Sequence, residues 1–374
     1  MAMASVMLMG MSVVGTSAAS VSDFSDVDSI NNLEAVSIAT GLGIFDGYDD
    51  GEFKPERVVT RAEMAVVIAK ILHGADVDPS IFVGESKFTD VPAWAEGYVN
   101  LCDSLGIIEG YGDGKFGPND PVTTVQANIM LLKALGYYTA EGDNLPANWA
   151  DAQLQATSKV TALGFFGDEA LKMDAGLTRE DVAELTFNAL FAQRVAYDDV
   201  RGLHVKANDR NVVVTNGTKD EYNTLAHNTF DLYAVEGTVI ANGMTSDKLS
   251  ASLKSEAQTR VLFDENVDLD KDGKVDATAD KYYDFEIASG LDFIGHAVTV
   301  YYTIENKAPV VYAMVDEATL VAELTYNASS TKLATAANEA GFKKNTILDW
   351  NADQYFVNFD LETTVNDLNT DGIA

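Results

Sequence analysis

Two arginines stand at the predicted first residues of helices, where a cation is unusual. Arg61 lies in Thr60-Arg-Ala-Glu63, and Arg179 lies in Thr178-Arg-Glu-Asp181. A threonine followed three residues later by an acid is typical of a capping box at a helix N-terminus. The helix dipole disfavours a cation there, whereas a guanidinium binds a carboxylate through two parallel hydrogen bonds. The arginines therefore predict sites for a negatively charged ligand group; the alternative is that they are solvated or paired with local carboxylates.

A second stretch has the residue types of a calcium loop. Asp268-Leu-Asp-Lys-Asp-Gly-Lys-Val-Asp276 places acids at loop positions 1, 3, 5 and 9 and glycine at position 6, as in an EF-hand. Position 12 is Ala279, so the bidentate acid is absent, although Asp280 follows. We expect a structural Ca²⁺ site of modest affinity, with an acidic β-turn as the alternative. The predicted metal ligands are Asp268, Asp270, Asp272 and Asp276.

Catalytic motifs are not recognisable in this chain. The four histidines are scattered, and neither His-Glu-x-x-His nor Gly-x-Ser-x-Gly occurs. Ser329-Ser-Thr-Lys332 matches Ser-x-x-Lys, but the companion motifs Ser-Asp-Asn and Lys-Thr-Gly are missing. Among 58 acidic residues no spacing singles out a carboxylate pair for glycoside hydrolysis. We therefore predict a protein that is not an enzyme.

The predicted helix that begins at Arg61 belongs to a block that recurs along the chain. Gly47-Tyr-Asp-Asp-Gly-Glu-Phe-Lys-Pro55 precedes it, and Gly110-Tyr-Gly-Asp-Gly-Lys-Phe-Gly-Pro118 precedes a second helix that starts Thr123-Thr-Val-Gln126. The second copy thus keeps the capping threonine but has Thr124 in place of the arginine. The third copy, around Arg179, has lost the Gly-Tyr loop. A repeat of this kind cannot bury its apolar face alone, so we expect the copies to pack together.

The first two copies begin with Phe24-Ser-Asp-Val27 and Phe88-Thr-Asp-Val91. Together with the Gly-Tyr loops and the Thr-Arg-Ala-Glu start, these motifs resemble the S-layer homology (SLH) family over roughly residues 21–194. The resemblance implies an all-α bundle of three repeats, shaped as a pseudo-trimer. We expect the repeats at residues 21–74, 86–138 and 145–194. The resemblance also implies non-covalent binding to an anionic secondary cell-wall polysaccharide, many forms of which carry pyruvate ketals.

The resemblance places glycan binding on particular residues of this chain. The family's ligand-binding arginine falls on Arg61 and Arg179. Trp94 and Trp149 open the upstream helices of repeats two and three and are candidates for stacking on sugar rings. Lys115, within the second Gly-Tyr loop, is a candidate for assisting an anionic ligand. The alternatives are that each tryptophan packs against the neighbouring repeat and that the lysine is merely exposed.

Export is predicted from the N-terminal residues and from the composition. Residues 1–19 are small, apolar and uncharged and end Ser17-Ala-Ala19, which indicates a signal peptide without its basic n-region. A membrane-spanning helix is the alternative reading of this stretch, and nothing later has the ~18 consecutive apolar residues of a span. A net charge of −33 argues against nucleic acid as a partner. The single cysteine, Cys102, excludes an intramolecular disulfide and is expected to be a buried core thiol.

The chain changes character after about residue 193. Short β-branched and aromatic segments separated by Gly, Asn and Asp predict a β-rich domain at residues 195–318, with a barrel or sandwich-like fold. A mixed segment at residues 319–374 follows, and we expect the natural chain to continue beyond it. The predicted strands lie at residues 211–215, 230–241, 282–287, 297–304 and 309–315.

The sequence as a whole predicts a secreted, multidomain protein of a bacterial cell-wall surface. Its repeats would bind wall polysaccharide, and its β-rich region would self-associate in a surface layer or space a further domain from the wall. One alternative is an anchored extracellular enzyme, such as a glycan hydrolase, whose catalytic domain lies beyond Ala374. The other is a module that uses the repeats for protein–protein assembly.

Overall fold

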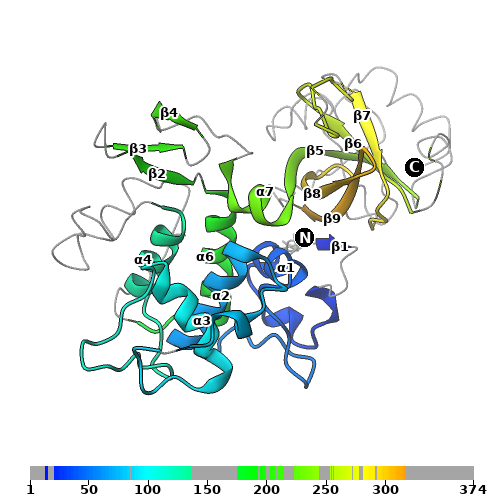
Figure 1. Cartoon of the computed structure of the whole chain (residues 1–374). Coiled ribbons are helices and arrows are strands. Elements are labelled where there is room, and N and C mark those ends of the chain that lie inside the picture. Colours follow the sequence, from blue (N-terminus) through cyan, green and yellow to red (C-terminus); the bar gives the residue numbers. More distant parts are fainter. Residues whose placement is uncertain are drawn as a thin grey trace, which may run out of the picture. The chain divides into compact units, whose positions relative to one another are not determined.

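A computed structural model gives the fold of the chain (Figure 1). It describes residues 13–15, 21–84, 86–136, 175–192, 194–198, 203–206, 209–213 and 223–243, and residues 253–316 with gaps at 254, 256, 272, 278–280 and 291–292. The chain divides into two compact units. The helical unit is Ala18–Tyr233, and the sheet unit combines Met1–Ser17 with Ala234–Ala374.

The helical unit holds the predicted repeats. Its short 3-10 helices are η1 (Val21–Asp23), η2 (Val27–Ser29) and η3 (Pro79–Phe82). A small antiparallel sheet has the order β2-β3-β4, with strands Val195–Asp198, Leu203–Lys206 and Asp209–Val213. The α-helices are α1 (Leu33–Gly41), α2 (Arg61–His73), α3 (Ala93–Ser104), α4 (Thr124–Ala134), α6 (Arg179–Phe191) and α7 (Leu225–Phe230).

The helices α2, α4 and α6 begin where the capping boxes predict. Thr60, Thr123 and Thr178 each accept a hydrogen bond from the backbone N–H three residues later, and the side chain at that position bonds back to the threonine N–H. Helix α3 begins at Ala93, one residue before the predicted opening at Trp94, and its last residue is Ser104. Gly106 takes a positive φ of 68°, which ends the helix. The predicted helix that opens at Trp149 lies outside the described residues.

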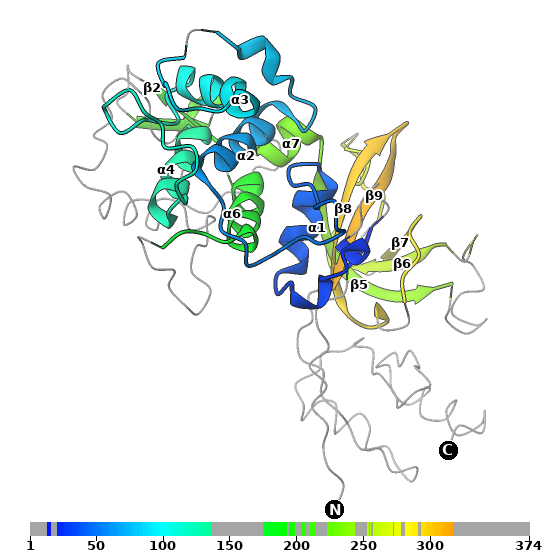
Figure 2. The same ribbon diagram turned by 90° about the horizontal axis from the view of Figure 1, so that it is seen from below.

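Three backbone hydrogen bonds tie the starts of α2, α4 and α6 into a closed ring. The N–H of Val59 donates to the Leu177 carbonyl at 2.9 Å, Val122 donates to Val59 at 2.9 Å, and Leu177 donates to Val122 at 3.0 Å. All three residues are buried, and each stands directly before a capping threonine. The three helices also contact one another and lie grouped in Figure 2. Each copy therefore touches both others at the same structural position.

The end of the helical unit lies later than residue 193. Helix α7 packs against α2 and α6, and its Leu225 and Ala226 are buried. Asn223 ties this region to the end of α6, because its side-chain nitrogen donates to the Arg194 carbonyl at 2.7 Å. As a result, β2–β4 and α7 group with the helices and not with the sheet unit, whose main segment starts at Ala234.

The sheet unit contains a six-stranded sheet of order β1-β9-β8-β5-β6-β7. The described strands of this unit form one sheet, and the predicted barrel or sandwich is not confirmed. Strand β1 lies within the predicted signal peptide and pairs antiparallel with β9; cleavage there stays a prediction. The bounds are β1 (Val13–Gly15), β5 (Tyr233–Asn242), β6 (Thr259–Phe263), β7 (Lys281–Phe285), β8 (Ala297–Glu305) and β9 (Ala308–Asp316).

Two features of the sheet differ from the sequence prediction. Strand β6 was not predicted, because charged Arg260 interrupts a run of only five residues. Its guanidinium is neutralised by Asp284 on β7, with Nε 2.6 Å from Oδ1. Strand β5 begins at Tyr233 and not at residue 230, because α7 ends there and Asp231 takes a left-handed φ of 51°.

Candidate functional site

The aspartate of each Phe-x-Asp-Val motif holds a Gly-Tyr loop. The Asp26 carboxylate accepts hydrogen bonds from the backbone N–H groups of Phe53 and Lys54, both at 2.8 Å. Asp90 does the same in the second copy, accepting from Phe116 at 2.8 Å and Gly117 at 3.0 Å. Burial raises the pKa of Asp90, but the hydrogen bonds from these amides lower it more, so the pKa lies below its ordinary value.

Aromatic packing fixes the same loops from inside. The rings of Phe24 and Phe53 lie 5.6 Å apart, and those of Phe88 and Phe116 lie 5.4 Å apart. The first glycine of the second loop, Gly110, is required by this contact, since a Cβ there would lie 2.4 Å from the Phe88 ring. The repeated motif thus folds each loop into one defined shape.

Arg61 connects the first repeat to the loop of the second. Its Nε donates to the Phe116 carbonyl at 3.0 Å, and its Nη2 donates to the Glu109 carbonyl at 2.8 Å. The guanidinium carbon lies 5.0 Å from the centre of the Tyr111 ring. The side chain is buried, and this burial lowers the pKa of Arg61, opposed by the Coulomb attraction of Tyr111, Asp120 and Asp90.

Arg179 makes the equivalent connection from the third copy to the loop of the first. Its Nε donates to the Phe53 carbonyl at 2.9 Å, and its Nη2 donates to the Asp46 carbonyl at 2.8 Å. Its guanidinium carbon lies 4.8 Å from the centre of the Tyr48 ring. Burial lowers the pKa of Arg179, and the neighbouring charge of Arg57 lowers it further.

Both predicted arginines therefore lie at junctions between copies. What the sequence did not predict is that backbone carbonyls occupy Nε and Nη2 of each guanidinium. A charged donor satisfies a carbonyl strongly, and it holds the neighbouring loop against the helix start. Binding of a carboxylate by these two arginines stays a prediction.

Two more cations surround the Tyr48 ring. Lys54 Nζ lies 4.6 Å from the ring centre, and the Arg57 guanidinium carbon lies 5.5 Å from it. Both side chains reach solvent, with 33% and 38% of their surface exposed, and both pair with local acids. We call Tyr48, Lys54, Arg57 and Arg179 the Tyr48 site. Arg57 was missed from the sequence, although it stands only two residues after the loop proline.

The corresponding arrangement around Tyr111 is different. The Tyr111 hydroxyl donates to Asp120 Oδ2 at 2.9 Å. Burial and this hydrogen bond raise the pKa of Tyr111, while Arg61 lowers it. Among the described residues Arg61 is the only cation that lies over this ring. We call Tyr111, Gly117, Asp120 and Arg61 the Tyr111 site.

The other predicted glycan residues have different surroundings. Trp94 lies in the first turn of α3 and is 56% exposed, so it is available to an external ligand. Lys115 is exposed in the second loop, and its backbone N–H donates to Asp113. Trp149 lies outside the described residues. Thr124, which replaces the arginine in the second copy, is fully buried, and its N–H donates to Ala175 of the third copy at 3.3 Å.

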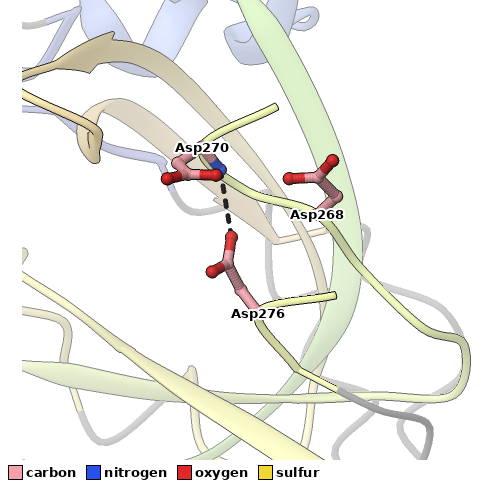
Figure 3. A group of neighbouring side chains, drawn as sticks. All are labelled: Asp268, Asp270 and Asp276. Carbon is pink, nitrogen blue, oxygen red and sulfur yellow. Dashed lines mark hydrogen bonds between the residues drawn. The ribbon is translucent and has the colours of Figure 1, made fainter. Parts of the chain in front are cut away.

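The acidic loop of the sheet unit brings three of its four predicted ligands together. One carboxylate oxygen from each of Asp268, Asp270 and Asp276 lies within 4.8 Å of the others (Figure 3). Asp276 Oδ2 accepts from the Leu269 N–H at 2.7 Å and the Asp270 N–H at 3.0 Å. Within the described chain, Asp268 Oδ1 is buried without a hydrogen-bond partner. Asp272 lies outside the described residues. An oxygen cluster of this kind suits Ca²⁺.

No helix in the described parts of the chain has both the length and the apolarity needed to cross a membrane.

Part of the helical unit matches a known family model. The S-layer homology domain matches residues 23–65 and 87–123. A cell surface protein of Thermoanaerobacter kivui is 31% identical over 59% of this chain and 28% of its own length. A surface-layer 125 kDa protein of Lysinibacillus sphaericus is 28% identical, over 67% of this chain and 23% of its own length. An amylopullulanase of Thermoanaerobacterium thermosulfurigenes is 24% identical, over 45% of this chain and 9% of its own length.

The chain thus spans less than a third of the length of each of these relatives. The matched residues include Asp26, Asp90 and Arg61, which build the two loops and one junction. Arg179 and the third copy lie outside the matched ranges, so three repeats are not confirmed. The two matched stretches are S-layer homology repeats, and the chain that carries them is a secreted protein of the cell-wall surface.

Proposed function

We propose that the helical unit anchors this surface protein non-covalently to an anionic, pyruvylated secondary cell-wall polysaccharide. The S-layer homology repeats support anchoring to the cell wall in general. The observation that carries the finer proposal is the placement of Arg61 and Arg179, each beside a tyrosine at a junction between copies. Cationic and aromatic groups at one place suit a sugar that bears a carboxylate.

The third copy contributes to the proposed anchor. Its helix α6 supplies Arg179 to the first loop, and the ring through Leu177 supports a three-repeat, pseudo-trimeric bundle. Exposed Trp94 offers a surface for stacking on a sugar ring, and Lys115 offers an exposed cation beside the second loop. The anchor is not catalytic: it holds the polymer and changes no bond in it.

A pull-down of the whole chain with protein-free cell-wall sacculi tests the anchor. The sacculi are used intact and after mild acid treatment that removes ketals and secondary polymers. We expect binding to intact sacculi and its loss after the treatment. Binding that survives the treatment would move the target to peptidoglycan. No binding to either preparation would favour protein–protein assembly.

We also propose a structural Ca²⁺ in the acidic loop of the sheet unit, with Asp268, Asp270, Asp272 and Asp276 as ligands. The support is the approach of three carboxylates and the buried, unpartnered Oδ1 of Asp268. A divalent cation would offset the mutual repulsion of these carboxylates and supply the partner that Oδ1 lacks. The backbone of the loop is closed by a β-bridge between Val267 and Ala277, so the ligands come from one short, tied segment.

A further inference from the structure

The Tyr48 and Tyr111 sites correspond residue for residue. Their loops begin at Gly47 and Gly110, 63 positions apart (110 − 47). At the same offset Lys54 corresponds to Gly117, and Arg57 corresponds to Asp120. Arg179 and Arg61 are also equivalent, because each donates to the same two carbonyl positions of its loop. Differences between the sites can therefore be assigned to single positions.

Both differences change the charge in the same direction. The Tyr48 site has cations at the two variable positions, whereas the Tyr111 site has a glycine and an acid. In the Tyr48 site Arg179 is affected by the like charge of Arg57 as well as by the opposite charges of Glu63 and Asp46. In the Tyr111 site Arg61 is instead surrounded by Asp120 and Asp90, and Asp120 holds the tyrosine hydroxyl. A ligand carboxylate would be attracted to the first site and would meet a carboxylate at the second.

The backbone conformation of Lys54 supports the same difference between the two sites independently of charge. It adopts a left-handed backbone with φ of 59°, a conformation that disfavours every residue with a Cβ. The equivalent Gly117 has φ of 71°, so the loop geometry itself calls for glycine. A strained residue that persists against such a preference points to a use for its side chain. The Lys54 ammonium is the group that this strain places beside the Tyr48 ring.

Two of the three cations in the Tyr48 site are exposed enough for a ligand in solution to contact them. Arg179 is only 9% exposed, and its donors serve the loop carbonyls, whereas Lys54 and Arg57 are about a third exposed. Asp50, the partner of Lys54, is 50% exposed, and Glu63, the partner of Arg57, is 31% exposed. Such pairs contribute little to stability, so a ligand carboxylate can compete with them.

We propose that the Tyr48 site alone binds the carboxylate of the wall polysaccharide, with Lys54 and Arg57 as its contact cations. Arg179 holds the loop and adds its charge to this site, and the Tyr111 site is a structural junction without anion binding. This inference rests on the proposed function and narrows it from two equivalent sites to one.

Exchanging the charges at the equivalent positions tests the inference. Intact sacculi are the probe, and the readout is the concentration of sacculi at which half of the whole chain pellets. We expect Arg57→Asp to weaken binding by at least about tenfold. Asp120→Arg gives the Tyr111 site the residue of the other copy, and we expect it to leave binding unweakened or to raise it. Lys281→Asp, an exposed change of the same charge in the sheet unit, is the matched control and should bind as wild type.

The variant Lys54→Gly separates a loss of binding from a loss of folding. The second copy shows that glycine suits this backbone, so we expect an unchanged or higher Tm together with binding weakened about threefold. Wild-type affinity for sacculi in both Arg57→Asp and Lys54→Gly would overturn the inference while leaving the anchor intact. Equal losses of affinity in Arg57→Asp and Tyr111→Ala would also overturn it. If Arg57→Asp does not fold, Lys54→Gly decides alone. Failure of the wild-type chain to pellet would instead reject the proposed function.

Discussion

At the scale of single residues, one carboxylate decides the shape of each Gly-Tyr loop. Asp26 and Asp90 each accept two successive backbone N–H groups, which would otherwise be left without partners near the buried rings of Phe53 and Phe116. The requirement is for an ionised acid, because a protonated carboxyl cannot accept as strongly at both oxygens. This explains in physical terms why an aspartate stands two residues after the phenylalanine in both copies.

Acid should loosen the second loop through Asp90. Its pKa in the folded protein lies below the ordinary 3.8, so its contribution to stability is complete above that value and is lost as the pH falls through the folded pKa. We expect Asp90→Asn to lower the free energy of unfolding at neutral pH and to make it less dependent on pH below about 4. Urea titrations between about pH 2 and pH 7 measure both effects, with exposed Asp49→Asn as the control. An unchanged pH dependence in Asp90→Asn would refute this role.

Cys102 should report opening of the helical unit. The thiol is fully buried on α3, and burial raises its pKa to about 12. Since the thiolate is the reactive form, we expect negligible alkylation of the native chain near neutral pH and rapid alkylation in denaturant. The chain has no other cysteine, so the labelled fraction counts unfolded helical units directly. Fast, complete labelling under native conditions would contradict the buried position.

At the scale of elements, the arginines act as links between a helix and the loop of another copy. Arg61→Ala should leave the carbonyls of Phe116 and Glu109 without their charged donor. We expect a loss of about 3 kcal/mol in the free energy of unfolding. Arg61→Lys should recover only part of it, because one ammonium cannot reproduce the planar fork. Urea unfolding measures the loss.

Amide exchange locates the effect of the same change. The Tyr111 N–H donates to Lys115 across the loop, so its protection should fall in Arg61→Ala, whereas that of Tyr48 in the first loop should not. Arg179→Ala should give the reverse pattern. Equal loss of protection in both loops would mean that the arginines stabilise the unit generally and not their own junctions.

The acidic loop is an element of the sheet unit, and calcium should act on that unit alone. We expect millimolar Ca²⁺ to raise the Tm of the sheet unit by a few degrees, and Asp268→Ala to abolish the rise because it removes the carboxylate that carries the buried oxygen. The Tm is followed by calorimetry, and Cys102 alkylation shows that the helical unit does not respond. An equal rise with Mg²⁺, or none with Ca²⁺, would remove the site.

Helix starts and loop positions were predictable from the sequence, because they depend on local rules. Thr60, Thr123 and Thr178 each fix a helix start within four residues, and the capping geometry follows from those residues alone. The partners of Arg61 and Arg179 were not predictable, because carbonyls at positions 109 and 46 look the same in any sequence. Arg57 was missed for a similar reason: its meaning depends on Tyr48, which only the fold brings beside it.

At the scale of the whole molecule, the two units were harder to predict than their parts. Composition placed the change of character near residue 193, but α7 and the strands β2–β4 belong with the helices. Long-range contacts decided this, namely those of α7 with α2 and α6. Whether the strands close into a barrel or sandwich was likewise beyond the sequence, since alternation in each strand says which face is buried but not whether a sheet closes.

The ring formed by Val59, Val122 and Leu177 has a mechanical consequence. An open row of repeats under tension can detach at its weakest neighbour and then peel away one member at a time. A closed ring has no terminal member, so a pull on any one copy is shared by the two bonds it makes with the others. If the cell wall holds one copy while shear acts on the rest of the chain, the helical unit should give way as a single piece, at a higher force and over a narrower range than a linear array.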